Sequence, residues 1–366
     1  KKEYQTKYCV GCELEKTDGE LTQEGRCPIH PNKDIERIDE ENYFFALSKT
    51  APLLEKLYAD NQTLVVPDFR INEMKAFLAR GLQDFSISRL KAKMSWGVPV
   101  PGDEAHVMYV WFDALTNYIS TLGWPENRSG EYKSFWEEGE KIQYCGKDNV
   151  RQQYMMWQAM LLAAELPTTD HIIINGFINS GGQKMSKSLG NVISPFAVIE
   201  LFTPVTDFPD DVLRFVLLHD ISSFEDSDMT IESIKQSYNT NLANGIGNLT
   251  SRIMKMATSY DVALDAGETT AMPEIAVQMD NYDLTLAMKE MQAQTSKIDE
   301  KISTYQPFKT IKEDEAKAKL QVKELLADLL QVAVTLNPFL PRTANHIQTL
   351  IKEHRMPEKP LFNRFP

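Results

Sequence analysis

The feature that most constrains the fold is a loop rich in glycine, lysine and serine at 181–191, Gly-Gly-Gln-Lys-Met-Ser-Lys-Ser-Leu-Gly-Asn. It follows the apolar run His171–Asn175, which is typical of a strand, and precedes a Ser-Pro pair at 194–195 that indicates a helix start. Glycine lets the backbone approach a ligand closely, and two cations three residues apart, Lys184 and Lys187, suit a polyphosphate whose charge grows during a reaction. The pattern predicts a strand, a phosphate-binding loop and a helix, although a solvated turn has a similar composition.

Two further apolar runs, 107–112 and 142–145, indicate buried strands, and helical patterns follow them at 113–122 and 149–166. This alternation of strands and helices predicts a parallel, doubly wound α/β sheet. Ligands bind such sheets at the carboxyl ends of the strands. The residues at that edge are Trp111, Asp113, Asp148 and Gly176.

Aromatic side chains on the two predicted helices point to an amino-acid pocket. Trp111, Ala114 and Tyr118 are spaced by three and four residues, and Gln153 and Trp157 are four residues apart. Such a face suits an unbranched, polarizable side chain such as the thioether of methionine, which packs well against ring edges. The same spacing also occurs in an ordinary hydrophobic core.

Two close pairs of metal-binding residues lie near the start of the chain. Cys9 and Cys12 form one pair, and Cys27 and His30 form the other. Three thiolates and one imidazole make a closed tetrahedral site, so we expect one structural zinc ion. A disulfide pair or free thiols are the alternatives, but Cys145 lies far away in an apolar strand, which argues against a secreted disulfide framework.

Composition limits the class of protein. A chain of 366 residues with 42% hydrophobic residues is expected to form two or three domains. Its net charge of −13 argues against sequence-independent nucleic-acid binding, which depends on phosphate neutralisation. With no run of 18 apolar residues and no signal peptide, we expect a cytoplasmic protein without a membrane partner.

The last third of the chain has the pattern of a helix bundle. Residues 242, 246, 249, 253 and 256 are apolar and repeat at helical spacing, and further helices are predicted from 282 to 305, around 322–329 and from 341. Asn244, Asn248 and Arg252 fall four residues apart on another helix face, where they could read base edges of an unpaired RNA loop, and Phe308 could stack on a base. A solvated polar face is the simpler alternative.

Taken with their order along the chain, the motifs Lys-Met-Ser-Lys-Ser, Tyr-Val-Trp-Phe-Asp-Ala-Leu-Thr-Asn-Tyr at 109–118 and Gly-Lys-Asp at 146–148 resemble the methionyl-tRNA synthetase family of class I aminoacyl-tRNA synthetases. The resemblance implies the second half of a Rossmann-like catalytic sheet with a zinc-knuckle insertion, followed by an all-α anticodon-binding bundle. It implies the substrates methionine, ATP with Mg²⁺ as counter-ion, and methionine tRNA.

The resemblance also assigns residues to these ligands. The methionine site would comprise Trp111, Ala114, Leu115, Tyr118, Asp148, Gln153 and Trp157. The ATP site would comprise Lys184, Ser186, Lys187, Ser188 and Gly176, with Lys184 and Lys187 stabilising the charge of pyrophosphate. The anticodon site would comprise Asn244, Asn248, Arg252 and Phe308. Many family members carry histidine where this chain has Gln153, and commonly tryptophan where it has Phe308.

The resemblance divides the chain into four parts. These are an insertion remnant at 1–90 with the knuckle at 9–30, the second half of the catalytic sheet at 91–180, the loop and connector at 181–235, and the anticodon-binding domain at 236–366. The His-x-Gly-His motif of the family is absent, and the chain begins with Lys1 rather than Met. We therefore expect a fragment that lacks its N-terminal part and cannot activate methionine alone.

Two other functions remain open at this stage. One is a class I synthetase for leucine, isoleucine or valine, which the single knuckle and the lack of a long editing insertion disfavour. The other is a non-catalytic tRNA-binding relative, which the intact lysine loop disfavours. No appended dimerisation domain follows the bundle, so we expect a monomer.

Overall fold

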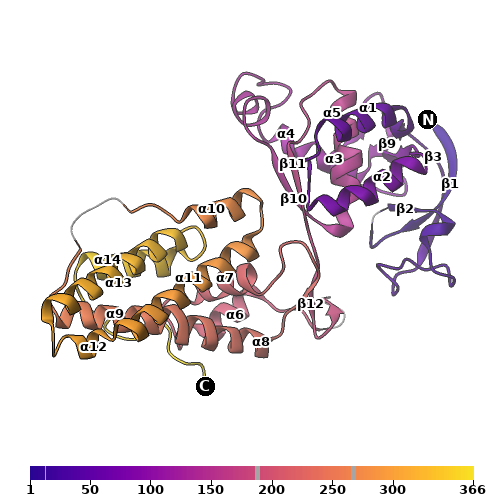
Figure 1. Ribbon diagram of the computed structural model, residues 1–366. Helices are drawn as coiled ribbons and strands as arrows, with labels where there is room; N and C mark the ends of the chain where they lie inside the picture. The colour runs from indigo at the N-terminus through magenta and orange to yellow at the C-terminus, as the bar shows by residue number, and fades with distance from the viewer. Residues whose placement is uncertain (13, 186–189, 265–268) are drawn as a thin grey trace. The chain divides into compact units, whose positions relative to one another are not determined.

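The computed structural model describes residues 1–12, 14–185, 190–264 and 269–366, which divide into two units, Lys1–Ile174 and Asn175–Pro366 (Figure 1). Each unit has its own cluster of buried hydrophobic side chains. Within these described ranges, no helix combines the length and the apolar character needed to cross a bilayer.

The first unit mixes short strands and helices. Its strands are β1 (Lys2–Cys9), β2 (Leu14–Lys16), β3 (Ile35–Asn42), β4 (Phe44–Phe45), β5 (Val65–Val66), β6 (Phe85–Ser86), β7 (Ser88–Leu90), β8 (Pro99–Val100), β9 (Asp103–Met108), β10 (Ile142–Gly146) and β11 (His171–Asn175). Its α-helices are α1 (Leu47–Asp60), α2 (Ile71–Ala79), α3 (Val110–Leu115), α4 (Asn117–Ser120) and α5 (Gln158–Ala163). Short 3₁₀ turns are η1 (Asp18–Glu20), η2 (Asp68–Arg70) and η4 (Lys147–Asn149), and π-helical segments are η3 (Tyr132–Glu137) and η5 (Arg151–Trp157).

A three-stranded sheet in the order β10-β11-β5 forms the centre of the α/β part. β11 pairs in parallel with β5, with Ile172 opposite Val65. The helical run η5–α5 connects β10 to β11, as the sequence predicts, but its first half is a π-helix. This run packs against α1, where the rings of Tyr58 and Tyr154 stack with centroids 4.1 Å apart.

The strand predicted at 107–112 is partly wrong. β9 ends at Met108 and pairs in antiparallel fashion with β7 and β8, so it does not extend the parallel sheet. Residues 110–112 already belong to α3. Aromatic and β-branched residues favour strands in isolation, but here Leu115 and Ile119 are buried at helical spacing, and that packing decides the local structure.

The second unit is mainly a helix bundle. A small sheet in the order β13-β12-β14 comprises β12 (Ile178–Ser180), β13 (Gln183–Lys184) and β14 (Ser227–Asp228). The helices are α6 (Pro195–Phe202), α7 (Pro209–His219), α8 (Ile231–Ser237), the π-helical η7 (Tyr238–Gly247), α9 (Asn248–Ser259), α10 (Pro273–Asp280), α11 (Leu284–Tyr305), α12 (Pro307–Thr310), α13 (Glu315–Leu336) and α14 (Pro341–Lys352).

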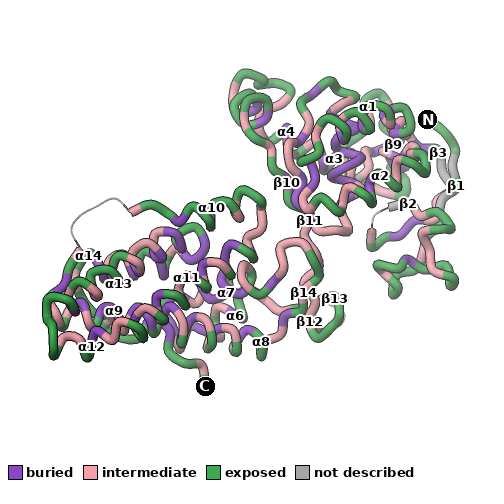
Figure 2. Tube along the Cα trace, viewed as in Figure 1, coloured by how far each residue is buried: buried purple, intermediate pink, exposed green. Residues whose placement is uncertain are grey.

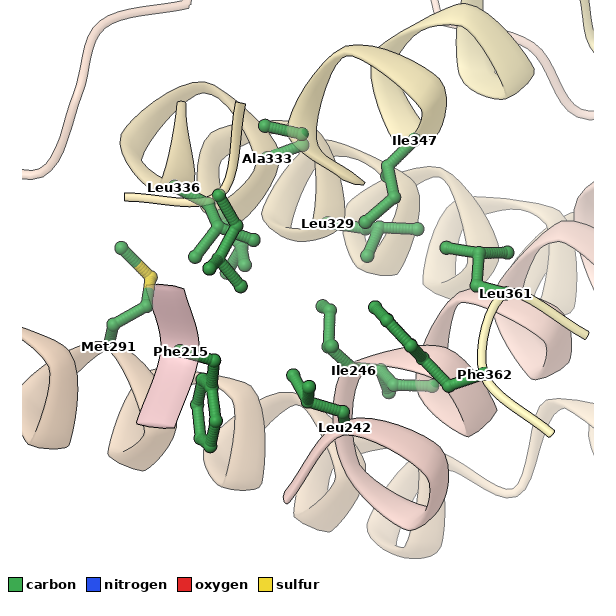
Figure 3. Packing of buried hydrophobic residues seen from close by; sticks show 14 of the residues in the cluster. Phe215, Leu242, Ile246, Met291, Leu329, Ala333, Leu336, Ile347, Leu361 and Phe362 are labelled. Atoms are coloured by element: carbon green, nitrogen blue, oxygen red, sulfur yellow. The ribbon is translucent and has the colours of Figure 1, made fainter. Parts of the chain in front are cut away.

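The core of the bundle lies between α7, η7, α9, α11, α13 and α14. Figure 3 shows Leu242, Ile246 and Leu329 pointing toward one another, and each is at most 6% exposed. Along α13, Figure 2 shows buried segments on one side and exposed segments on the other. Leu361 and Phe362, near the C-terminus, also enter this core (Figure 3). Phe362 forms an antiparallel bridge with Thr206. Burying a side chain of this size contributes about 1.5–3 kcal/mol, so the C-terminal segment is an integral part of the bundle.

Candidate active site and metal centre

The structure brings together the four predicted metal ligands. The Cys12 Sγ lies 3.4 Å from the Cys27 Sγ and 3.2 Å from the His30 Nδ1, and all four ligand atoms lie within 4.8 Å of one another. Ligand atoms arranged tetrahedrally around zinc are about 3.5–3.8 Å apart, given bonds of about 2.0–2.3 Å. Cys9 is the last residue of β1, and the other three ligands lie in the loops that follow β1 and precede β3. The donor set and its spacing therefore fit a zinc ion.

The pKa values of Cys12 and Cys27 are shifted in opposite directions. Burial, reinforced by the hydrogen bond with Cys27, raises the pKa of Cys12 to about 12. Burial acts in the same direction on Cys27, but hydrogen bonds from the backbone of His30 and from Cys12 outweigh it and lower its pKa. One thiolate is thus favoured before a metal binds, and a divalent cation would favour the others.

Gly11 allows the imidazole to reach this cluster. A Cβ atom at Gly11 would lie 2.5 Å from the Cγ and 2.8 Å from the Cδ2 of His30, so any side chain at this position would displace the ring. Gly19, in the same region, has open space at its Cβ position.

Three predicted methionine-site residues lie together where α4 meets η5. The ring centroids of Tyr118 and Trp157 are 5.9 Å apart, and the Nε2 of Gln153 donates a 3.0 Å hydrogen bond to the Tyr118 hydroxyl. Leu115 is buried beneath them in the same cluster, whereas Ala114 is exposed. Ala114, which the resemblance assigns to the methionine site, is thus on an exposed part of α3.

Trp111 and Arg89 line a cleft of the first unit. Arg89 is only 6% exposed, and its Cζ lies 3.8 Å from the ring centroid of Tyr109. Its Nη1 donates to the Ser86 hydroxyl at 2.7 Å, but its Nη2 and the Trp111 Nε1 have no hydrogen-bond partner among the described residues. Because Arg89 is buried, it does not form a surface salt bridge. Two buried donors lining one cleft are suited to an acceptor group of a ligand.

Asp148 lies at the end of β10, in η4. Its Oδ1 would be 2.8 Å from a Cβ atom at Gly146, so glycine at that position leaves room for the carboxylate. The structure therefore places Asp148 at a strand end, as the sequence predicts.

In the second unit, Gly181 and Gly182 form the turn of the hairpin between β12 and β13. Both have positive φ, +63° and +73°, and neither has neighbouring atoms where a Cβ would be, so the turn itself requires glycine. Lys184, in β13, is exposed, and its Nζ lies 4.3 Å from the ring centroid of Phe177. Ser186, Lys187 and Ser188 lie outside the described residues.

Gly176 has a packing role that the sequence did not reveal. A Cβ at this position would lie 2.1 Å from the backbone carbonyl carbon of Glu225. The close approach that glycine permits here is to the connector before β14, and the neighbouring Phe177 N–H donates to Asp226 at 2.9 Å.

The predicted anticodon residues lie on η7, α9 and α12. Asn248 is exposed and Phe308 is 48% exposed, so both are accessible. The Oδ1 of Asn244 accepts a 3.2 Å hydrogen bond from Arg364, and Arg252 forms an ion pair with Asp299. Because η7 is π-helical and Gly245 departs from helical dihedrals, Asn244 and Asn248 are not separated by one regular α-helical turn, as their spacing had suggested.

Sequence reasoning missed the polar residues behind Gln153. Gln143, Gln158 and Thr169 are buried and hydrogen-bonded to one another and to Gln153. The one available signal was the alternation along β10, where Gln143 shares the buried face with Cys145.

Comparisons with known proteins bear on both units. A family model described as "tRNA synthetases class I (M)" matches residues 1–254, and one described as "Anticodon binding domain of methionyl tRNA ligase" matches residues 255–360. The methionine–tRNA ligase of Thermosynechococcus vestitus is 41% identical over 256 residues, which are 69% of this chain and 46% of that protein. The Fusobacterium nucleatum enzyme is 32% identical over 363 residues, which are 95% of this chain and 56% of that protein. The chain thus spans about half the length of these relatives.

Two solved structures of methionyl-tRNA synthetase are also similar to this chain. The Mycobacterium tuberculosis methionyl-tRNA synthetase in complex with methionyl-adenylate superimposes with a TM-score of 0.85 at 28% identity, over 95% of this chain and 70% of that chain. Its apo form matches all of this chain and 77% of that chain, with a TM-score of 0.84 at 25% identity. These matches confirm the predicted fold class, a Rossmann-like α/β part joined to a helical bundle.

Proposed function

Because the chain belongs to the methionyl family of class I aminoacyl-tRNA synthetases, we propose that it supplies the methionine pocket, the lysine loop and the anticodon-binding bundle of a methionine–tRNA ligase. The reaction has two steps. The carboxylate of methionine attacks the α-phosphate of ATP to give methionyl-adenylate and pyrophosphate, and the terminal ribose of the tRNA then takes the methionyl group and releases AMP.

The observation that carries this proposal is the group formed by Tyr118, Gln153 and Trp157 in a chain that matches one methionyl family model over residues 1–254 and a second over residues 255–360. A ring pair with a nearby hydroxyl and amide suits a side chain that is apolar along its length but carries one weak acceptor. In this proposal Trp111, Ala114 and Leu115 complete the methionine site, and Asp148 lies among the polar groups near the substrates.

The first step needs no covalent intermediate with the protein, so its catalysis is positioning and charge stabilisation. We assign Lys184 and Lys187 to the pyrophosphate that leaves, and Ser186, Ser188 and Gly176 to ATP contacts. Mg²⁺ would accompany ATP as its counter-ion. The fourfold division at residues 90, 180 and 235 is part of the same proposal.

Zinc at Cys9, Cys12, Cys27 and His30 would hold the knuckle folded and would take no part in the chemistry. Asn244, Asn248, Arg252 and Phe308 would contact the anticodon of methionine tRNA. We further propose that residues 1–366 alone do not activate methionine, since the family's His-x-Gly-His motif is absent from them.

The test is methionine-dependent exchange of pyrophosphate into ATP, measured for residues 1–366 and for the same chain supplemented with the segment of a family member that carries His-x-Gly-His. Exchange is expected only in the supplemented protein. Exchange driven better by leucine, isoleucine or valine than by methionine would contradict the assignment of substrate.

Lys187→Ala in the active form should lower adenylate formation by about 30- to 1,000-fold, as expected for loss of about 2–4 kcal/mol of transition-state stabilisation. The dissociation constant of methionine should change little, because the lysine acts on the phosphates. Single-turnover kinetics and equilibrium binding separate the two effects, and equal losses in both would contradict a transition-state role.

A further inference from the structure

A cavity of about 430 Å³ lies inside the second unit, mainly between η7, α11 and α13. Its lining from α11 comprises residues 288, 291, 292, 295, 296, 299 and 300, which fall on one face of the helix because they recur at every turn. Ligand pockets in proteins commonly measure about 300–1,000 Å³, so this cavity has room for a small molecule. Of the four residues proposed for the anticodon, only Asn244 lines it.

The wall opposite α11 is the π-helical η7, which is interrupted at Gly245. This residue lines the cavity and has non-helical dihedrals, φ −88° and ψ −113°. The nearest atom to a Cβ at this position, beyond its own turn of helix, would be the carbonyl oxygen of Thr240, 3.8 Å away. The wall at Gly245 therefore faces open space instead of packing tightly against α11. Interruptions of this kind in helices are frequent at functional sites.

The polarity of the α11 face changes along the cavity. At one end Met288 and Met291 are each 2% exposed and pack in the apolar core with Leu336, where Met291 and Leu336 can be followed in Figure 3. At the other end lie the carboxylates of Asp299 and Glu300. Residues 288 and 300 are about 18 Å apart along the helix axis, at about 1.5 Å per residue. The cavity is thus apolar at one end and anionic at the other.

The polar groups in the middle of the cavity already have partners within the protein. The Nε2 of Gln292 donates to the Oδ1 of Asn241, and the Oε1 of Gln292 contacts the Nε2 of His219. The hydroxyl of Thr295 donates to the carbonyl oxygen of Met291 at 3.1 Å. A ligand does not need a polar group at this point, so an apolar chain can lie along the middle of the cavity.

Among the described residues that line the cavity, the charged ones are Asp299 and Glu300, and both are acidic. Asp299 forms an ion pair with Arg252, but its side chain is still 50% exposed. Glu300 is exposed and has no ion-pair partner in the described part of the chain. Two carboxylates at one end of an apolar cavity attract a cation and repel an anion.

We propose that this cavity binds an amphipathic monoamine, a small molecule with an apolar chain and one terminal ammonium group. The chain lies against Met288 and Met291, whose flexible thioethers adapt to apolar groups of different shapes. The ammonium group lies at Asp299 and Glu300. This site is separate from the proposed methionine site, and the proposal does not depend on the proposed function.

The test is a titration with n-octylamine, followed by NMR of a protein with isotope-labelled methionine methyl groups. The methyl groups of Met288 and Met291 report on the cavity, and those of Met155 and Met156 report on the first unit. We expect n-octylamine to shift the resonances of Met288 and Met291. Shifts at Met155 and Met156 without shifts at Met288 and Met291 would overturn the proposal.

The comparison ligand is n-octanoate, which has the same number of carbons and the opposite charge. It should bind about tenfold more weakly than n-octylamine, because two partly exposed carboxylates repel its head group. Equal affinities for the amine and the carboxylate would contradict the proposed charge recognition.

A pair of double variants tests the two carboxylates. Asp299→Asn with Glu300→Gln should weaken n-octylamine binding about tenfold and remove the preference over n-octanoate. Asp280→Asn with Glu313→Gln removes the same charge from exposed positions outside the cavity and should change neither value. Equal losses in the two double variants would mean that only the overall charge matters, which would overturn the site.

A second pair of variants tests the cavity itself. Thr295→Phe places a ring in the middle of the cavity and should abolish the n-octylamine shifts. Thr304→Phe is the control, because Thr304 lies on the same helix and also donates to the carbonyl four residues before it, but does not line the cavity. Unchanged binding in Thr295→Phe would show that the amine binds elsewhere.

Discussion

At the scale of single residues, the metal centre depends on the absence of a side chain as much as on its ligands. A methyl group at Gly11 would overlap the His30 ring, 2.5 Å from its Cγ. Gly11→Ala should therefore weaken zinc binding by about 10- to 100-fold, as other changes next to metal ligands do. Competition with a chromophoric chelator measures this. Gly19→Ala, where the Cβ position is open, is the matched control, and an equal loss in both variants would contradict a steric cause.

The residues that form the candidate sites were the best predicted feature of this protein. The four metal ligands and the grouping of Tyr118, Gln153 and Trp157 follow from spacing and resemblance, and the structure places them together. Gln143 and Thr169 could not be assigned, because what makes them important is a hydrogen bond between segments 26 residues apart. Periodicity reports which face of an element is buried, but it does not report which polar groups meet there.

At the scale of elements, an ion-pair network joins α11 to α13. The Lys301 Nζ lies 2.9 Å from Glu324 and 2.7 Å from Asp328, and the Tyr305 hydroxyl also donates to Glu324. Hydrogen bonding to Lys301 lowers the pKa of Glu324 from its ordinary 4.5, and these carboxylates raise the pKa of Lys301 above 10.5. The network therefore contributes fully between about pH 4.5 and 10.5, and its contribution falls outside that window.

Lys301→Met should lower the free energy of unfolding of the helical unit by about 0.5–1 kcal/mol at pH 7, because the side chains are partly exposed. The difference from the unmodified protein should shrink as the pH falls below 4.5, where Glu324 becomes protonated. Urea unfolding at several pH values measures it. Lys297→Met, which removes a lysine that contacts an amide rather than a carboxylate, should show no such pH dependence.

Among the elements, long helices were predicted well and the strand near the site was not. The helices expected from 282 to 305 and from 341 are α11 and α14, because long apolar stripes specify them. Residues 107–112 begin as a strand and continue as a helix. The position of this boundary depends on the packing of α3 against η5. The spacing of apolar residues does not show that η5 and η7 are π-helical rather than α-helical.

At the scale of the whole molecule, all four metal ligands lie in the first unit, and the two hydrophobic clusters share no residue. Calorimetry of the zinc-loaded chain should therefore give two transitions, and a chelator should lower the midpoint of only one of them. Limited proteolysis should then show cleavage within 1–174 while 175–366 stays intact. A chelator that shifts both transitions equally would mean that the units unfold as one.

The segment from Gln152 to Leu161 is buried at every position, although it runs through more than two helical turns. This segment is covered on all sides by its neighbours, and two of its side chains, Gln153 and Gln158, are amides whose hydrogen-bond partners come from β10, α4 and the loop before β11. The segment from Gln152 to Leu161 can pack fully only after those neighbouring elements are in place. We therefore expect this segment, which carries Gln153 and Trp157 of the proposed methionine site, to become ordered late in the folding of the α/β unit.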